Sequence, residues 1–288
     1  MTLSINKLGE YLGAEIHGID LAAPIDDAVV DELKYAFYKY SVLVFHDQDI
    51  DDDQQIEFSK LFGPLEPTMV NDPSGGGGWI NRLSNVDDEG NILPTSHQRM
   101  LYLKGNILWH SDSSYKKVPS RGALLYALEV PPEGGETEYA SMKAGYAALA
   151  EEKKKAFEGL IAEHSLLHSR NKITPGLMDQ KFKDEVPPVP QRLIRKLPET
   201  GEKTLFLGAH ASHIIGWPVE KGRDLLDELL DWTTQPQFVY KHEWQTKDLV
   251  MWDNRCSLHR GRPWDAKSYK RVMRRTTLLG DGPTARID

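Results

Sequence analysis

The sequence is poor in three features, and each one narrows what the protein can be. It has one cysteine, Cys256, so no disulfide can form within the chain, which suits a reducing cytoplasm. No apolar run approaches the length of a membrane span, and the first twenty residues lack the blocks of a signal peptide. Positive charge is outnumbered: the net charge is −8, which argues against a broad nucleic-acid-binding surface. We therefore expect a cytoplasmic protein that binds a small molecule, not nucleic acid or a membrane.

What the chain does contain is ordinary for a globular protein. Hydrophobic residues make up 40% of its 288 residues and charged residues 27%. That length can bury a sizeable core, and mainly β chains of this size often fold as one unit. The composition therefore predicts a single domain over residues 1–288.

The hydrophobic pattern predicts helices first and mostly strands later. A helix capped by Asp26 should run to Tyr40, and a second should follow an aspartate cap and end at Gly63 and Pro64. Helical patterns recur at 141–161 and 218–232. Strand-like runs lie at 41–45, 122–130, 137–140, 203–208, 238–244, 248–252 and 274–279. Strands with helices outside them favour a mainly β sandwich or barrel of the jelly-roll type.

Two long segments show little periodicity. Residues 71–106 are rich in Gly, Asn, Asp and Pro, and residues 165–200 contain several prolines. Such segments predict a loop insert and a lid, because long connections in a compact domain are usually functional or mobile. The run Gly75–Gly78 is not a phosphate-binding loop, since the Lys-Ser/Thr ending and the flanking strand and helix are missing.

The strongest candidates for metal-binding residues lie in two motifs, WHSDSSY at 109–115 and WDNRCSLHRGR at 252–262. If the first motif is a strand, His110 and Asp112 point to the same face and can hold one ion, with His259 as a third ligand. Two imidazoles and a carboxylate form the triad that holds non-haem Fe(II) and leaves three positions open. The His-x-Asp pair alone is weak evidence, because chance pairs are common and buried structural histidines are the alternative.

A basic cluster, KRVMRR at 270–275, stands out in this acidic chain and is a candidate binding site for an anion. Arg271 and Arg275 are four apart in a run that we expect to be extended, so both can face the same side. The alternative is that they are surface charges at the end of a strand.

Several motifs in the same order resemble the Fe(II)/α-ketoglutarate-dependent dioxygenases of the taurine dioxygenase group, and within it the chlorophenoxyacetate dioxygenases. The resemblance covers almost the whole chain. It rests on SVLVF, FGPLE, LSNV, LWHSDSSY, PPEGGETEYASM, LGAHASH, DLVMWDNRCSLHRGR and RVMRRTTL. It implies a double-stranded β-helix of the cupin-like type that uses Fe(II), α-ketoglutarate (2-oxoglutarate) and O2.

The resemblance also assigns roles to individual residues. It implies that His110, Asp112 and His259 are the metal ligands. Thr137 and Arg271 match the residues that bind the distal carboxylate of 2-oxoglutarate. A hydroxyl and a planar guanidinium suit a buried carboxylate, which would be costly to leave unpaired.

The substrate side is assigned in the same way. Arg275 matches the residue that holds the anionic head of the primary substrate, and Ser113 a position that lines the substrate pocket, with Asn106 and Lys104 as further candidates. The implied reaction hydroxylates an aryloxyalkanoate beside its ether oxygen, giving a phenol and glyoxylate, with succinate and CO2 as coproducts. The family usually forms dimers or tetramers, so a homo-oligomer is expected.

Other interpretations stay open at this stage. The same chemistry could act on a sulfonate or alkyl sulfate such as taurine, since an arginine binds either anion. A non-catalytic metal-binding jelly-roll protein is the alternative from a different class. His210 and His213 receive no catalytic role, Trp109 and Trp252 are expected in the core, and nothing marks Cys256 as a nucleophile.

Overall fold

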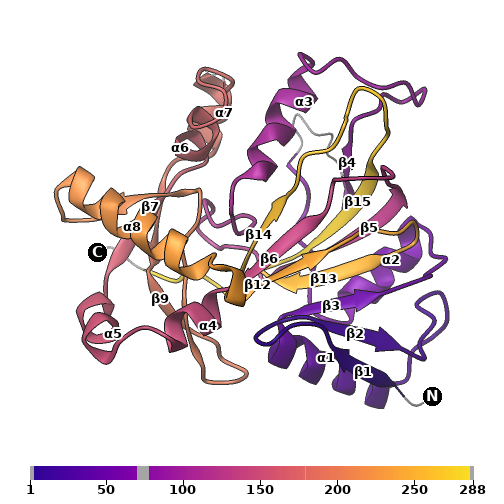
Figure 1. Ribbon diagram of the computed structural model, residues 1–288, viewed down its shortest axis with the longest axis horizontal. Helices are drawn as coiled ribbons and strands as arrows, with labels where there is room; N and C mark the ends of the chain where they lie inside the picture. The colour runs from indigo at the N-terminus through magenta and orange to yellow at the C-terminus, as the bar shows by residue number, and fades with distance from the viewer. Residues whose placement is uncertain (1–2, 70–77, 179, 286–288) are drawn as a thin grey trace.

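The computed structural model describes residues 3–69, 78–178 and 180–285 (Figure 1). Its largest sheet has the strand order β1-β2-β3-β13-β5-β15-β4. These strands span Ser4–Lys7 (β1), Ala14–His17 (β2), Val42–Phe45 (β3), Asn81–Ser84 (β4), Gly122–Glu129 (β5), Leu249–Asp253 (β13) and Val272–Leu278 (β15). Neighbouring strands are antiparallel, except that β2 and β3 are parallel.

Three smaller sheets accompany it in the described part of the chain, with the orders β12-β6-β14, β11-β7-β8 and β10-β9. The first contains Thr137–Ser141 (β6), Val239–His242 (β12) and Ser257–Gly261 (β14). The other two contain Ile161–His164 (β7), Val189–Arg192 (β8), Ile194–Lys196 (β9), Lys203–Leu205 (β10) and Ala211–Ile214 (β11). Sheet-rich architecture with helices around it agrees with the mainly β prediction.

Helices lie outside the sheets, at both ends of the molecule (Figure 1). They are Asp27–Tyr40 (α1), Asp52–Lys60 (α2), Gln98–Leu103 (α3), Met142–Ala147 (α4), Glu151–Phe157 (α5), Leu166–Asn171 (α6), Gln180–Glu185 (α7) and Val219–Thr233 (α8), with 3-10 turns at Lys104–Ile107 (η1) and Pro236–Phe238 (η2). The helices α1 and α2 pack on the large sheet, where Leu33, Phe37 and Phe45 are essentially fully buried.

The helix starts follow local chemistry only in part. Asp51 caps α2 through a capping box: its carboxylate accepts from the Gln54 backbone N–H at 2.8 Å, and the Gln54 side chain accepts from the Asp51 N–H. Asp26 occupies the matching position of α1, but its side chain makes no capping hydrogen bond, so the predicted side-chain cap is wrong.

Four predicted segments need correction. The helix predicted over 141–161 is two short helices, α4 and α5, because the chain turns between them and buries Leu149. The strand predicted over 203–208 ends at Leu205. The predicted loop 71–106 contains β4, α3 and η1, and the predicted lid 165–200 contains α6, α7, β8 and β9. Residues 70–77, with most of the glycine run, lie outside the described residues.

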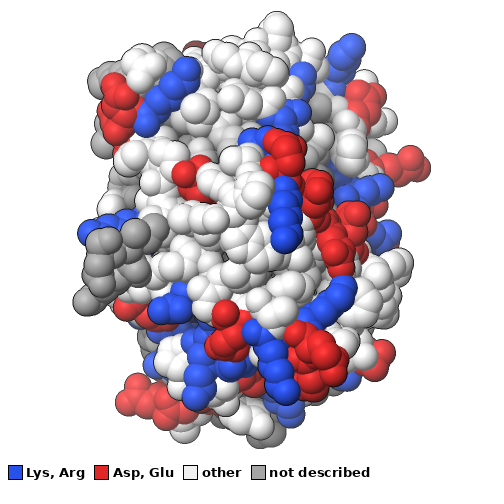
Figure 2. Space-filling model, turned by 90° about the vertical axis from the view of Figure 1, so that its left-hand side faces the viewer, with Lys and Arg blue, Asp and Glu red and all other residues white. Residues whose placement is uncertain are grey.

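Two further features are the distribution of surface charge and the length of the helices. On the face drawn in Figure 2, basic and acidic side chains are interspersed. Within the described ranges, every helix is too short or too polar to cross a bilayer.

Candidate active site

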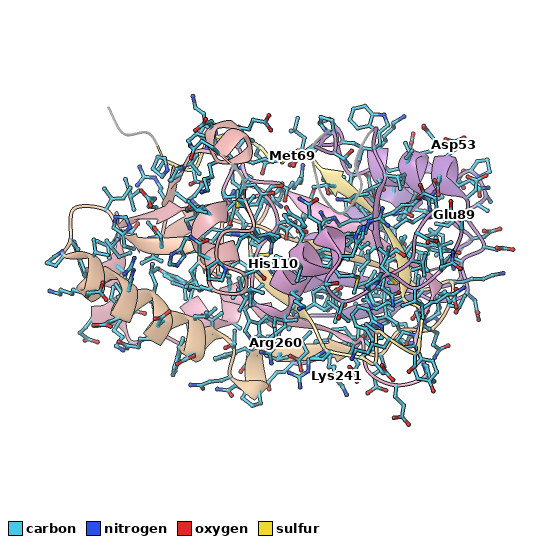
Figure 3. The ribbon with its side chains drawn as sticks, turned by 90° about the horizontal axis from the view of Figure 1, so that it is seen from above. Asp53, Met69, Glu89, His110, Lys241 and Arg260 are labelled. Carbon is cyan, nitrogen blue, oxygen red and sulfur yellow. The ribbon has the colours of Figure 1, made fainter. Side chains whose placement is uncertain are left out.

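His110 and His259 are brought together by backbone pairing near the middle of the molecule, where Figure 3 labels His110. The His110 N–H donates to the His259 carbonyl at 3.0 Å, and the His259 N–H donates back at 2.8 Å. Their ring centroids are 4.1 Å apart. His259 lies in β14, but His110 forms only an isolated bridge and Asp112 begins a turn. The strand predicted for WHSDSSY is therefore wrong, although the convergence that it was meant to explain is present.

The turn holds Asp112 through its backbone rather than through strand geometry. The Asp112 N–H donates to the side-chain oxygen of Asn254 at 3.1 Å, and the Ser120 hydroxyl donates to the Asp112 carbonyl at 2.9 Å. The carboxylate consequently faces both imidazoles: Oδ1 lies 4.0 Å from His110 Nε2 and Oδ2 lies 3.6 Å from His259 Nε2.

Burial and charge set the protonation of this cluster. All three side chains are at most about one-tenth exposed. Burial lowers the pKa of His110 and, with the neighbouring His110 ring, lowers the pKa of His259 well below its usual value. Burial alone would raise the pKa of Asp112, but the charge of Arg275 holds it well below its usual range. Two neutral imidazoles thus face an ionised carboxylate at neutral pH.

This donor set fits a divalent iron ion. His110 Nδ1 donates to the Leu108 carbonyl at 2.7 Å, which leaves the Nε2 lone pair directed at the cluster. One ligand atom from each of the three residues lies within 4.8 Å of the others, close enough for one ion to contact all three. Two imidazoles and one carboxylate match the facial triad of non-haem Fe(II) sites.

A cavity of about 730 Å³, counted with its open mouth, adjoins this cluster and is lined by His110, His259, Thr137, Arg271 and Arg275. Much of the remaining lining is apolar or aromatic: Leu83, Leu103, Ile107, Leu125, Trp252 and Trp264. Five of the predicted site residues therefore line one cavity.

Arg271 and Thr137 are each fixed by a neighbour. Arg271 Nε donates to the Gly135 carbonyl at 3.1 Å, its backbone N–H donates to Asn85 at 2.8 Å, and burial lowers its pKa to about 10. Thr137 Oγ1 accepts from the Trp244 indole at 2.9 Å, so its own proton is available to an acceptor in the cavity.

Arg275 and Ser113 lie on another side of the metal cluster. Arg275 Nη1 donates to Asp112 Oδ1 at 2.7 Å. The Ser113 hydroxyl donates to Glu66 at 2.8 Å and faces a smaller adjoining pocket that Arg275 also lines. Of the further pocket candidates, Asn106 lines the main cavity and Lys104 is exposed.

The residues given no catalytic role are accounted for. His210 bonds Ser169 at 2.8 Å, 6.1 Å from the His110 ring, and His213 is near Glu163. Cys256 contacts the Ser41 hydroxyl, and burial raises its pKa to about 12, so it is a poor nucleophile.

Three positioning residues were missed from the sequence: Trp252, Asn254 and Trp244. Trp252 is buried as predicted, yet its ring lies 4.7 Å from the His259 ring and its indole donates to Asn254 at 2.9 Å. Asn254 in turn holds Asp112, and Trp244 holds Thr137. The signal for the first two was their place in the WDNRCSLHRGR motif, which was used only for His259.

Comparison with known proteins shows which family the chain belongs to. A family model described as "Taurine catabolism dioxygenase TauD, TfdA family" matches residues 4–277. The chain belongs to the TauD/TfdA family. One TauD/TfdA relative, the "Alpha-ketoglutarate-dependent 2,4-dichlorophenoxyacetate dioxygenase" of Burkholderia sp. (strain RASC), is 41% identical over 96% of this chain and 95% of its own length.

Two further TauD/TfdA relatives show the same likeness. The "(S)-phenoxypropionate/alpha-ketoglutarate-dioxygenase" of Sphingobium herbicidovorans is 39% identical over 96% of this chain and 95% of its own length. A solved structure titled "Crystal structure of AAD-2 in complex with Mn(II) and N-oxalylglycine" is similar with a TM-score of 0.92 and 41% identity, covering 100% of both chains. The recognised family is therefore confirmed.

Proposed function

We propose that the protein is an Fe(II)/2-oxoglutarate-dependent dioxygenase that hydroxylates an aryloxyalkanoate such as a phenoxyacetate. The observation that carries this proposal is a single cavity lined by two of the ligating imidazoles, a hydroxyl and two arginines. Relatives at about 40% identity that are named for phenoxy acids support the substrate class. Aromatic and branched side chains in the cavity suit the aryl ring.

In this proposal, His110, Asp112 and His259 hold iron, and Arg271 and Thr137 bind the distal carboxylate of 2-oxoglutarate. Bound iron supplies the redox chemistry by which O2 is consumed and 2-oxoglutarate becomes succinate and CO2. Arg271 gives a cationic donor and Thr137 a neutral one, so the carboxylate is neutralised in a partly buried place. Arg275 and Ser113 face the substrate side, and Arg275 binds the substrate's anionic head.

The same proposal includes the finer architecture and assembly. We assign the sheets to a double-stranded β-helix of the jelly-roll type, because the small sheet β12-β6-β14 carries His259 and Thr137 opposite the Arg271 and Arg275 end of the large sheet. A single domain, a dimeric or tetrameric homo-oligomer and a cytoplasmic location stay predictions from the sequence.

The test is succinate formation from 2-oxoglutarate with Fe(II) and ascorbate, across phenoxyacetates, phenoxypropionates, other aromatic acids, taurine and alkyl sulfates. We expect succinate and a phenol in equal amounts from at least one aryloxy acid. Succinate formation that accompanies turnover of a sulfonate or a sulfate would contradict the aryloxyalkanoate substrate class but support the 2-oxoglutarate-dependent reaction. Absence of iron and 2-oxoglutarate binding would leave the non-catalytic jelly-roll alternative.

A further inference from the structure

Asn85 directly follows β4 of the large sheet, and only 1% of it is exposed. Within β4 the pairing with β15 is regular, and Ser84 lies opposite Val272. The next pair, Asn85 and Arg271, is different. Two residues of a hydrogen-bonded antiparallel pair normally exchange both backbone bonds, but the Asn85 carbonyl here accepts from the Leu93 N–H at 2.8 Å. The Arg271 N–H therefore needs another acceptor.

The side chain of Asn85 supplies that acceptor. Its Oδ1 accepts from the Arg271 N–H at 2.8 Å, while the Asn85 N–H donates to the Arg271 carbonyl at 3.4 Å. The other end of the same amide holds a loop, because Nδ2 donates to the carbonyls of Ala266 and Tyr269, each at 3.0 Å. Both N–H groups of the amide are thereby used, so Asn85 has no side-chain hydrogen left for a ligand although it lines the cavity.

The loop held in this way, residues 264–270, contains a second neighbour of the arginine. The centre of the Trp264 ring lies 5.5 Å from the central carbon of the Arg271 guanidinium, and both residues line the cavity. The Trp264 indole donates at 3.4 Å to the Tyr269 carbonyl, which Asn85 also binds. Among the described residues, the other hydrogen bonds of 264–270 stay within the loop. Asn85 is therefore the main polar connection between this loop and the sheet.

We propose that Asn85 is a positioning residue for the distal carboxylate of 2-oxoglutarate, because its amide fixes both Arg271 and the loop that contains Trp264. This inference rests on the proposed function, which assigns that carboxylate to Arg271. A guanidinium binds a carboxylate through aligned N–H donors, so its orientation matters as well as its charge. Asn85 acts through Arg271 by keeping that orientation fixed.

The test measures binding of two acids to the full-length, Mn(II)-loaded protein by titration calorimetry. The first is 2-oxoglutarate, and the second is 2-oxopentanoate, which has a methyl group in place of the distal carboxylate. We expect Asn85→Ala to bind 2-oxoglutarate roughly 10-fold more weakly, as for one or two lost hydrogen bonds, and to bind 2-oxopentanoate unchanged. In an Arg271→Ala background the same substitution should cost nothing further, because the residue through which it acts is gone.

The matched control is Asn91→Ala. Asn91 is exposed in the connection that follows Asn85, and its side chain bonds Asp87 instead of the loop. This variant should bind both acids as the wild type does.

Trypsin gives a readout that needs neither metal nor ligand. Lys267 is exposed in the loop that Asn85 holds. Asn85→Ala should be cut there roughly 10-fold faster than the wild type, because local opening becomes easier, and Asn91→Ala should be cut at the wild-type rate. Melting temperatures show that the variants fold. If Asn85→Ala does not fold, Asn85→Asp keeps the acceptor for the Arg271 N–H, removes both donors to the loop, and should also be cut faster.

Three results would each overturn the positioning role: an equal loss of affinity for both acids, an additive loss in the Arg271→Ala background, or unchanged cleavage at Lys267. A wild type that binds both acids equally would instead contradict the role of Arg271 in the proposed function, and the inference would fall with it. The wild-type comparison thus tests the proposed function, and the Asn85 variants test the inference.

Discussion

Two sides of the active-site cavity are built in different ways. The sheet side consists of Thr137 in β6 and of Arg271 and Arg275 at β15, and each of these side chains has a protein partner. The helical side consists of α3 and η1, which contribute Leu103, Asn106 and Ile107 to the lining. Fixed polar and charged groups suit the recognition of carboxylates, which both ligands of the proposed reaction carry. Mainly apolar side chains on short helices suit the aryl ring of the proposed substrate.

The largest expected effect comes from the metal ligands that lie between the two sides. His110→Ala removes one of three ligand atoms, so iron should no longer be retained and coupled succinate formation should fall by well over roughly 100-fold, the upper range for changes behind a ligand. Iron content after desalting and succinate release measure this. Full iron retention would show that the cluster is structural.

On the sheet side, substitutions of Arg271 and Arg275 should affect different substrates. Arg271→Ala should raise KM for 2-oxoglutarate roughly 10- to 100-fold, because a charged hydrogen bond is lost. Arg275→Ala should chiefly weaken use of the primary substrate. Steady-state kinetics with each substrate varied in turn measures both, with Arg274→Lys as a control, since Arg274 bonds Asp52 and Gln55 behind the sheet. An effect of both changes on the cosubstrate alone would contradict the division of roles.

A smaller effect is expected from the indole behind Thr137. Trp244→Phe keeps the ring but removes the N–H that donates to Thr137 Oγ1 at 2.9 Å. KM for 2-oxoglutarate should rise about 2- to 10-fold, the size of one neutral hydrogen bond, with kcat little changed. If the effects of Trp244→Phe and Thr137→Val on KM are additive in the double variant, the two residues are not coupled.

The smallest effect concerns stability farther behind the sheet side. His46 Nδ1 lies 2.6 Å from Asp248 Oδ1, and this hydrogen bond raises the His46 pKa above its usual value. A raised pKa stabilises the fold fully below about pH 6.5, the unfolded value, and the contribution is lost as pH rises through the folded value. The Tm difference between the wild type and His46→Gln should therefore shrink between about pH 6 and pH 9. A constant difference would assign His46 to packing alone.

The sequence determined the chemistry of the site because residue types and motif order carry it. Its motifs single out His110, Asp112, His259, Thr137 and Arg271, which lie in one candidate metal cluster and around one cavity. It also determined several long elements: the helices α1 and α8 and the strands β5 and β13 follow clear apolar patterns.

Only the tertiary structure decided how those residues are held and which ones support them. WHSDSSY is a bridge and a turn rather than a strand, because His259 and Asn254 supply its backbone partners from far along the chain. Burial and pairing are sums over residues distant in sequence, so they appear only once the chain has folded.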